Sequence, residues 1–144
     1  MARPTMNTTG KPWSVTQVAL GAKISMRTAR TLVESQWIPS KTLTGDHVLI
    51  ARVAAALLDA PRPEGVSRSG ADASTHDRNR QLLDRAYALL SEPNPAAVAL
   101  ISPNEVYVAE TNFKAMAFLE DQPGNEAILL LPVGRWAKEV LDGR

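Results

Sequence analysis

Apolar residues near the start of the chain recur at the spacing of an α-helix. Val15, Val18 and Ala19 fall on one side of a helix with about 3.6 residues per turn. Ser14 and Gln17 stand three residues apart, the spacing of a capping box, in which each side chain bonds the backbone N–H of the other residue. The pattern therefore predicts a short helix that begins just after Ser14.

A tight turn is predicted between this helix and a second one. Gly21 can adopt the left-handed backbone conformation that ends many helices. Residues 21–24, Gly-Ala-Lys-Ile, have the length and the small residues of a helix-turn-helix corner. Ser25 follows this corner and favours the N-cap position, so a second helix is predicted to begin there.

The second helix separates into an apolar face and a basic face. At about 100° per residue, the apolar side gathers Ala29, Leu32, Val33 and Gln36, with Met26 at its edge. The opposite side gathers Arg27, Arg30, Thr31 and Glu34. The first side can pack against neighbouring helices, whereas the second is predicted to face outward. Guanidinium groups suit guanine edges and phosphates because each donates two hydrogen bonds together.

A third helix and a linker are predicted to follow. Residues 47–59 carry a broad apolar stripe, and Thr44 is a candidate cap for this helix. We expect it to complete a three-helix unit over residues 12–60. Residues 61–73 are rich in Pro, Gly, Ser and charge, which is typical of a linker. Residues 1–11 are polar and turn-rich and are predicted to form a flexible arm.

Residues 74–144 predict a small second domain that mixes helices and strands. A helix capped by Ser74 or Thr75 is expected to run to about Ser91, with Arg78 and Arg80 on a largely solvated face. A terminal helix is expected over residues 135–141. The fold class predicted for the whole chain is α+β, with an N-terminal helix-turn-helix followed by an antiparallel sheet.

A meander of three or four antiparallel strands is expected between those two helices. Apolar runs at 96–101 and 105–110 follow each other closely enough for a hairpin. Residues 113–119 fit either a third strand or a short helix. Residues 127–131 have the continuous apolar character of a buried strand.

Charge is divided unevenly along the chain. The 144 residues carry a formal net charge of only +1. Residues 1–52 contain seven Lys or Arg and two acidic residues, a net of +5. Residues 53–144 contain nine basic and thirteen acidic residues, a net of −4. Such asymmetry is expected when one part of a protein meets phosphates and the other does not.

The basic segment resembles the N-terminal DNA-binding domain of the MerR family and the related excisionase-like winged helices. The matching residues are the opening Trp13-Ser14-Val15, Val18-Ala19, the core Ile24-Ser25-Met26-Arg27-Thr28-Ala29-Arg30 and the exit Trp37-Ile38-Pro39. The resemblance implies DNA contacts from Arg27, Thr28 and Arg30. Only residues 40–45 precede the next helix, so the wing of these families is very short or absent here. The coiled coil and metal-binding cysteines of many MerR proteins are also absent, so effector sensing of that kind is not implied.

The predicted DNA-binding residues have separate roles. Ser25 caps the recognition helix and offers its backbone amide to a phosphate. Arg27, Arg30, Thr31 and Glu34 face base edges, and Thr28 joins them through the resemblance. Lys23 and Lys41 contact phosphates, Lys41 from the short wing. The alternative is an ordinary helical corner, in which Arg30 and Glu34 form a surface ion pair worth about 0.3–0.5 kcal/mol.

Catalytic and metal-binding patterns are missing from the sequence. It has no cysteine, and His47 and His76 have no partner at metal-ligand spacing. No nucleophile, phosphate-loop or dinucleotide motif occurs. No stretch approaches the ~20 apolar residues of a membrane span. We therefore expect no catalytic activity, no cofactor, no metal and no membrane partner, in a cytoplasmic protein.

These patterns predict a regulator of transcription that binds specific double-stranded DNA, a repressor of the compact kind that suits a phage or plasmid. Residues 74–144 are expected either to mediate self-association or to receive a signal. A homodimer through these residues is favoured, because repressors gain affinity by presenting two copies to two half-sites. A monomer with a fully packed sheet is the alternative. Two other functions stay open: an excisionase-like architectural factor in recombination, and a protein-interaction module without DNA binding.

Overall fold

The computed structural model describes residues 12–63, 73–122, 124 and 127–143. In chain order its elements are α1 (Val15–Ala22), α2 (Met26–Glu34), α3 (Asp46–Leu57), α4 (Ala73–Ala88), β1 (Val98–Ile101), β2 (Val106–Ala109), α5 (Asn112–Glu120), β3 (Leu129–Leu131) and α6 (Val133–Asp142). This mixture of helices with an antiparallel sheet confirms the predicted α+β class. The predicted arm and most of the predicted linker lie outside the described residues.

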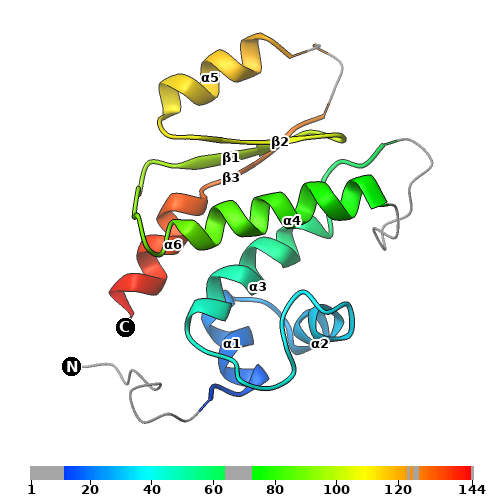
Figure 1. Ribbon diagram of the computed structural model, residues 1–144, viewed down its shortest axis with the longest axis vertical. Helices are drawn as coiled ribbons and strands as arrows, with labels where there is room; N and C mark the ends of the chain where they lie inside the picture. Colours follow the sequence, from blue (N-terminus) through cyan, green and yellow to red (C-terminus); the bar gives the residue numbers. More distant parts are fainter. Residues whose placement is uncertain (1–11, 64–72, 123, 125–126, 144) are drawn as a thin grey trace.

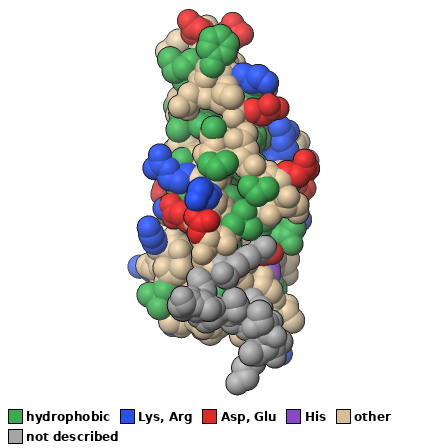
Figure 2. Space-filling view, turned by 90° about the vertical axis from the view of Figure 1, so that its left-hand side faces the viewer, with side chains coloured by type: hydrophobic (Ala, Val, Ile, Leu, Met, Phe, Trp, Pro, Cys, Tyr) green, Lys and Arg blue, Asp and Glu red, His purple; other side chains and the backbone are tan. Residues whose placement is uncertain are grey.

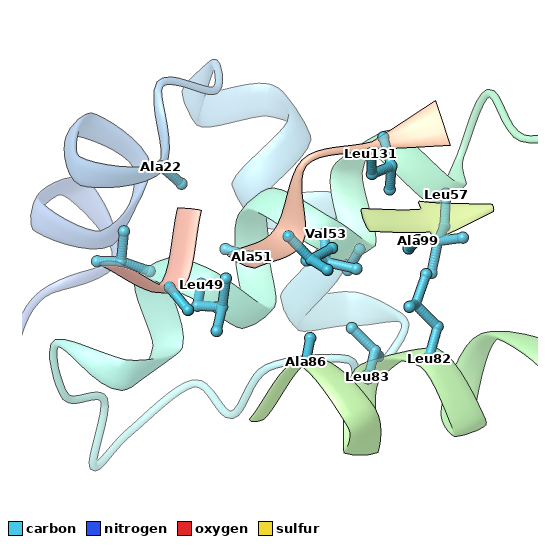
Figure 3. Close-up of a cluster of buried hydrophobic side chains, with 14 of the residues drawn as sticks. Ala22, Leu49, Ala51, Val53, Leu57, Leu82, Leu83, Ala86, Ala99 and Leu131 are labelled. Atoms are coloured by element: carbon cyan, nitrogen blue, oxygen red, sulfur yellow. The ribbon is translucent and has the colours of Figure 1, made fainter. Parts of the chain in front are cut away.

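The central helix, α3, is buried on almost every side. It packs against α1, α2, α4 and α6 (Figure 1). Leu49, Ala51 and Val53 of α3 are fully buried, and Figure 3 shows them beside side chains of α4 and of the sheet. A helix that is apolar all round belongs in a core. One hydrophobic core therefore joins the predicted N-terminal unit to the predicted C-terminal domain, whose boundaries stay a prediction.

The sheet has the strand order β2-β1-β3, and both pairings are antiparallel. α5 covers one face, whereas α4 and α6 lie on the other (Figure 1). Leu100 of β1 is paired with Tyr107 and Leu130, so these three side chains share the face toward α5. Their neighbours Ala99 and Leu131 turn to the main core. The central strand β1 is buried along its whole length because both faces are covered.

Two strand predictions are wrong. The sheet is not a meander, because β3 pairs with β1 instead of with β2. The run at 127–131 does not form a fully buried strand: β3 is an edge strand in which Leu130 is half-exposed. Residues 113–119 belong to a helix, because Thr111 Oγ1 accepts a hydrogen bond from Lys114 N at 3.1 Å and so caps α5. α5 carries the chain over the sheet, from one edge strand to the other.

Two predicted helix caps are also wrong. α3 begins at Asp46 with Gly45 at the N-cap, while Thr44 Oγ1 accepts from Asp46 N at 3.2 Å from just outside the helix. α4 begins at Ala73, so neither Ser74 nor Thr75 precedes it as a cap. α4 also ends at Ala88, earlier than predicted, and tighter turns continue from there.

Arg78 of α4 is buried, although the sequence pattern placed it on a solvated face. Its guanidinium donates hydrogen bonds to the carbonyl oxygens of Pro61, Ser102 and Pro103, the last two at 2.9 and 3.1 Å. Nε and Nη2 donate to Asn79 Oδ1. Burial, and after it the nearby positive charge of Arg62, lowers the pKa of Arg78. The side chain thus ties α4 to the segment after α3 and to the turn between β1 and β2.

Arg78→Met is predicted to lower the free energy of unfolding by about 3 kcal/mol, because it removes the donor from one buried and two partly buried backbone carbonyl groups and from the buried Asn79 Oδ1. Arg85→Met is the matched control, since Arg85 is exposed on the same helix. It should change stability by less than about 0.5 kcal/mol. Urea unfolding of both variants checks this, and equal effects would contradict the role assigned to Arg78.

Gly134 lies where α6 meets the segment that leads into β1. Its N–H donates to Ala97 O at 3.0 Å, and a Cβ there would lie 2.1 Å from Asn94 O and 2.7 Å from Ala97 N. No side chain fits in this space, so the close approach of α6 requires glycine.

Gly134→Ala is therefore predicted to destabilise the fold by about 1–3 kcal/mol through steric overlap with backbone atoms. Gly124→Ala is the control, because a Cβ at Gly124 would meet nothing within 4 Å. Thermal unfolding measures both variants. If Gly134→Ala were as stable as Gly124→Ala, the close backbone contact would be wrong.

Candidate nucleic-acid interface

α1 begins with the predicted capping box. Ser14 Oγ accepts a hydrogen bond from Gln17 N at 3.1 Å, and Gln17 Oε1 accepts one from Ser14 N at 2.7 Å. Val18 and Ala19 are buried, and Val15 packs against the core from a half-buried position. The cap and the apolar face predicted for this helix are both confirmed.

The end of α1 differs from the prediction. Lys23, with a φ of 60°, takes the left-handed conformation that was expected of Gly21. The N–H groups of residues 23 and 24 donate to carbonyls in the last turn of α1, as in a Schellman motif. Gly21 stays inside the helix, where a Cβ would lie 3.0 Å from Val48 Cγ2, so its small size serves the contact with α3. A turn of residues 23–25 therefore joins α1 to α2.

Ser25 caps α2 as predicted. Its Oγ accepts from Thr28 N at 3.0 Å and donates to Thr28 Oγ1 at 3.0 Å. Thr28 is half-buried, and its hydroxyl is engaged by this cap. The first N–H groups of a helix lack intrahelical acceptors, which makes the start of α2 suited to an anion such as a phosphate.

The outer face of α2 carries Arg27, Arg30 and Glu34, which are all exposed. Ala29 and Leu32 on the opposite face are fully buried. Among the residues that the structure describes, the guanidinium groups of Arg27 and Arg30 take part in no hydrogen bond or ion pair. The surface pair between Arg30 and Glu34, which the sequence allowed, is therefore not formed.

Thr31 is less available than predicted. It is half-buried, and its Oγ1 donates to Arg27 O at 3.1 Å within α2. Gln36 was predicted on the packing face, but it is exposed beyond the end of the helix with a φ of 64°. α2 ends at Glu34, so the helical period no longer applies to Gln36.

The segment between α2 and α3 has one short β contact in place of a longer wing. Trp13 and Leu43 form an isolated antiparallel bridge, and Trp13 N donates to Leu43 O at 2.8 Å. This contact joins the residues before α1 to those before α3. Lys41 is exposed in this segment, so its side chain is accessible to a phosphate.

A hollow of about 370 Å³ lies between the turn and α3. Lys23, Ser25 and Thr28 line it from the side of the turn, and Arg52 and Asp59 line it from the side of α3. Lys23 and Ser25, two of the residues predicted to contact phosphates, therefore line the same hollow as Arg52. Arg52 was not among the predicted DNA-binding residues.

Arg52 is held in place by α6. Its Nη1 donates to Glu139 Oε1 at 2.9 Å, and its guanidinium carbon lies 4.4 Å from the centre of the Trp136 ring. Glu139 lies 87 residues further along the chain, so nothing in the local sequence points to this arrangement.

α4 places Arg80, a second basic side chain after Arg52, near the end of α2. His76 stacks on Trp37 with ring centres 4.8 Å apart, and the Arg80 guanidinium lies 5.7 Å from the Trp37 ring. Arg80 is exposed, as the sequence predicted, but its position beside Trp37 depends on how α4 packs.

His47 lies in the first turn of α3. Its Nδ1 accepts a hydrogen bond from Thr44 N at 2.9 Å, which requires that this nitrogen carry no proton. Burial lowers the pKa of His47, and the negative charge of Asp46 opposes that shift.

The protein is therefore predicted to lose stability when His47 becomes protonated. A pKa that is lower in the folded than in the unfolded state means that the unfolded chain binds more protons, so stability rises with pH. The stabilising contribution of neutral His47 is complete above about pH 6.5, the ordinary pKa of histidine. It declines as the pH falls below that value toward the lower pKa of the folded state.

His47→Gln should reduce the difference in the free energy of unfolding between about pH 5 and about pH 7. Urea unfolding at both pH values measures it. A pH dependence that is as large in His47→Gln as in the wild-type protein would exclude this assignment.

Comparison with known proteins gives no relative. No protein-family model matches the chain, and searches of curated proteins and of solved structures return no match. No described helix is both long and apolar enough to cross a membrane. In the same part of the chain, no group of three or more histidine and acidic side chains is placed to hold a metal ion. The resemblance to MerR-like and excisionase-like domains stays a prediction.

Proposed function

We propose that this protein is a transcriptional repressor that reads a specific double-stranded DNA sequence through α2. The outer face of α2 carries the proposal, because Arg27 and Arg30 are exposed there without partners among the described residues. An exposed Arg can donate two hydrogen bonds to the major-groove edge of guanine. Burial of Ala29 and Leu32 on the opposite face fixes the helix that presents these groups.

In this proposal α2 enters the major groove with its first turn against the duplex backbone. Lys23, the start of α2 at Ser25 and the nearby Arg52 contact phosphates, because all three line one hollow. Glu34 lies on the same face as the two arginines and accepts a hydrogen bond from a cytosine amine. Lys41, in the segment that follows α2, contacts a phosphate of the DNA backbone. Thr28 and Thr31 have smaller roles because their hydroxyls already bond within α2.

Binding to duplexes selected from a random library tests the proposal. Arg30→Ala is expected to weaken binding to the selected sequence by about 1–3 kcal/mol and to relax specificity at one base pair. Lys23→Ala should weaken binding to selected and random duplexes about equally, and it should reduce the slope of affinity against salt by about one. Arg135→Ala is the control for the loss of one positive charge, because Arg135 is exposed at the start of α6.

Two results would overturn the proposal. If the protein binds no duplex at low salt, the remaining interpretation is a protein-interaction module. If Arg30→Ala and Lys23→Ala weaken binding to selected and random duplexes by the same factor, α2 does not read bases. Binding only to arrays of sites, with bending of the duplex, would indicate an architectural role instead.

A further inference from the structure

The outer face of α5 is exposed and carries two large apolar side chains beside one acidic residue. Phe113 is 83% exposed and Met116 is 59% exposed, and both lie with Ala117 and the exposed Glu120 on one side of the helix. Ala115 and Phe118 lie on the other side and pack on the sheet. Figure 2 shows hydrophobic side chains at this end of the molecule, together with acidic and basic ones. Large apolar side chains gathered on one exposed helix face mark an interaction surface.

Opposite charges lie at the two ends of this face. Lys114 belongs to the first turn of α5, and Asp121 follows its last residue as the C-cap. Seven residues make about two helical turns, so the two charges lie on the same flank of the helix. If two α5 helices pack antiparallel about a two-fold axis, Lys114 of each copy meets Asp121 of the other. Ala117 lies near the middle, where a small side chain lets the helices approach.

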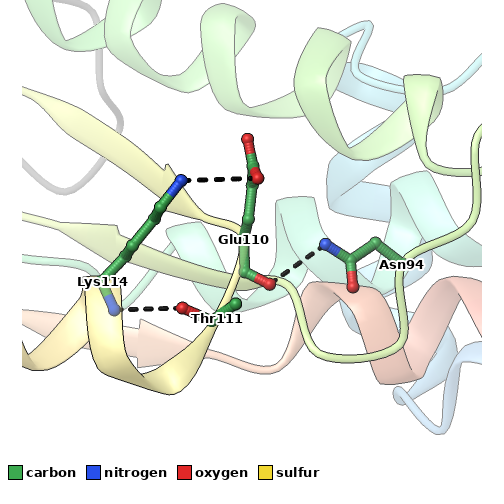
Figure 4. Close-up of polar contacts among 4 residues, drawn as sticks. All are labelled: Asn94, Glu110, Thr111 and Lys114. Carbon is green, nitrogen blue, oxygen red and sulfur yellow. Dashed lines mark hydrogen bonds and ion pairs between the residues drawn. The ribbon is translucent and has the colours of Figure 1, made fainter.

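The ion pair between Lys114 and Glu110 within one copy does not prevent Lys114 from pairing with Asp121 of a second copy. Lys114 Nζ lies 3.5 Å from Glu110 Oε2, and both side chains are more than half exposed (Figure 4). Exposed pairs of this kind contribute little. The position of α5 itself is fixed by the cap at Thr111 and by Asn94, whose Nδ2 donates to Glu110 O at 3.1 Å.

We propose that the outer face of α5 is a self-association surface that binds the same face of a second copy, with the two helices antiparallel. Because Lys114 at the start of α5 meets the acidic end of the second copy, Glu120 and Asp121, the surface is self-complementary in charge, as a two-fold interface requires. One pair of nine-residue helices buries less area than a standard stable interface. We therefore expect a weak dimer whose population depends on protein concentration.

This surface has a consequence for DNA binding, which rests on the proposed function. α5 lies at one end of the molecule, and α1 and α2 lie at the other (Figure 1). A dimer through α5 places its two α2 helices at opposite far ends. It therefore joins two separate duplex segments instead of occupying adjacent half-sites about one helical turn apart.

Sedimentation equilibrium over about 1–300 μM protein tests the self-association. The wild-type mass should move toward that of a dimer, and Phe113→Ser should weaken association about tenfold or more. Leu20→Ser is the matched control, because Leu20 is a 75% exposed apolar residue on α1 and should leave the mass curve unchanged.

Charge reversal gives a sharper test of the antiparallel arrangement. Lys114→Asp and Asp121→Lys should each weaken association several-fold, and the double variant should restore it. Each reversal places a charge that favours the helix dipole, so thermal unfolding should show that the fold is retained. A monomer at every concentration, equal effects of Phe113→Ser and Leu20→Ser, or no recovery in the double variant would overturn the proposal.

A two-duplex capture separates this inference from the proposed function. An immobilised duplex should retain a second, fluorescent duplex when wild-type protein is present above its dimer Kd. Phe113→Ser should still bind the first duplex but should not retain the second. Binding of single duplexes by a strictly monomeric wild-type protein would overturn the inference and leave the proposed function standing.

Discussion

Burial of α3 is the constraint on which the rest of the structure depends. Its core positions point in every direction around the helix axis, so no single neighbour can cover them. α1 and α2 cover one part, and α4 and α6 cover the rest. The small side chains of Ala51 and Ala54 let these helices come close. The α1–turn–α2 unit is thus held by a helix that the C-terminal half also needs.

Buried polar contacts make this shared core specific. Arg78 reaches the segment after α3 and the turn after β1 through carbonyl oxygens, and its hydrogen bonds within the described part of the chain include no acidic partner. Arg52 joins α3 to α6 through Glu139 and Trp136. Such directional contacts fix how the layers are placed, whereas apolar packing alone tolerates several arrangements. These contacts also position part of the candidate interface, because Arg52 lines the hollow beside the turn between α1 and α2.

The two ends of the molecule have different surfaces. At one end, α2 exposes two arginines above a buried apolar face. At the other end, α5 exposes Phe113 and Met116 on a face that also carries Glu120. The sheet, α4 and α3 separate these ends (Figure 1). The proposed function assigns nucleic acid to the first end, and the proposed self-association assigns a second copy to the other.

Some interactions within three or four residues could be predicted from the amino-acid sequence, although the caps of α3 and α4 were not. The caps at Ser14 and Ser25 and the exposed face of α2 depend on local hydrogen bonds and on helical period, so they were predicted correctly. The left-handed residue was misplaced, because Gly21 is needed for contact with Val48 and not for the turn. Tertiary structure alone decided that β1 is the central strand, that Arg78 is buried and that Arg52 stands beside Lys23. Those outcomes depend on partners 17 to 87 residues away, and packing of distant surfaces leaves no periodic pattern in a single chain.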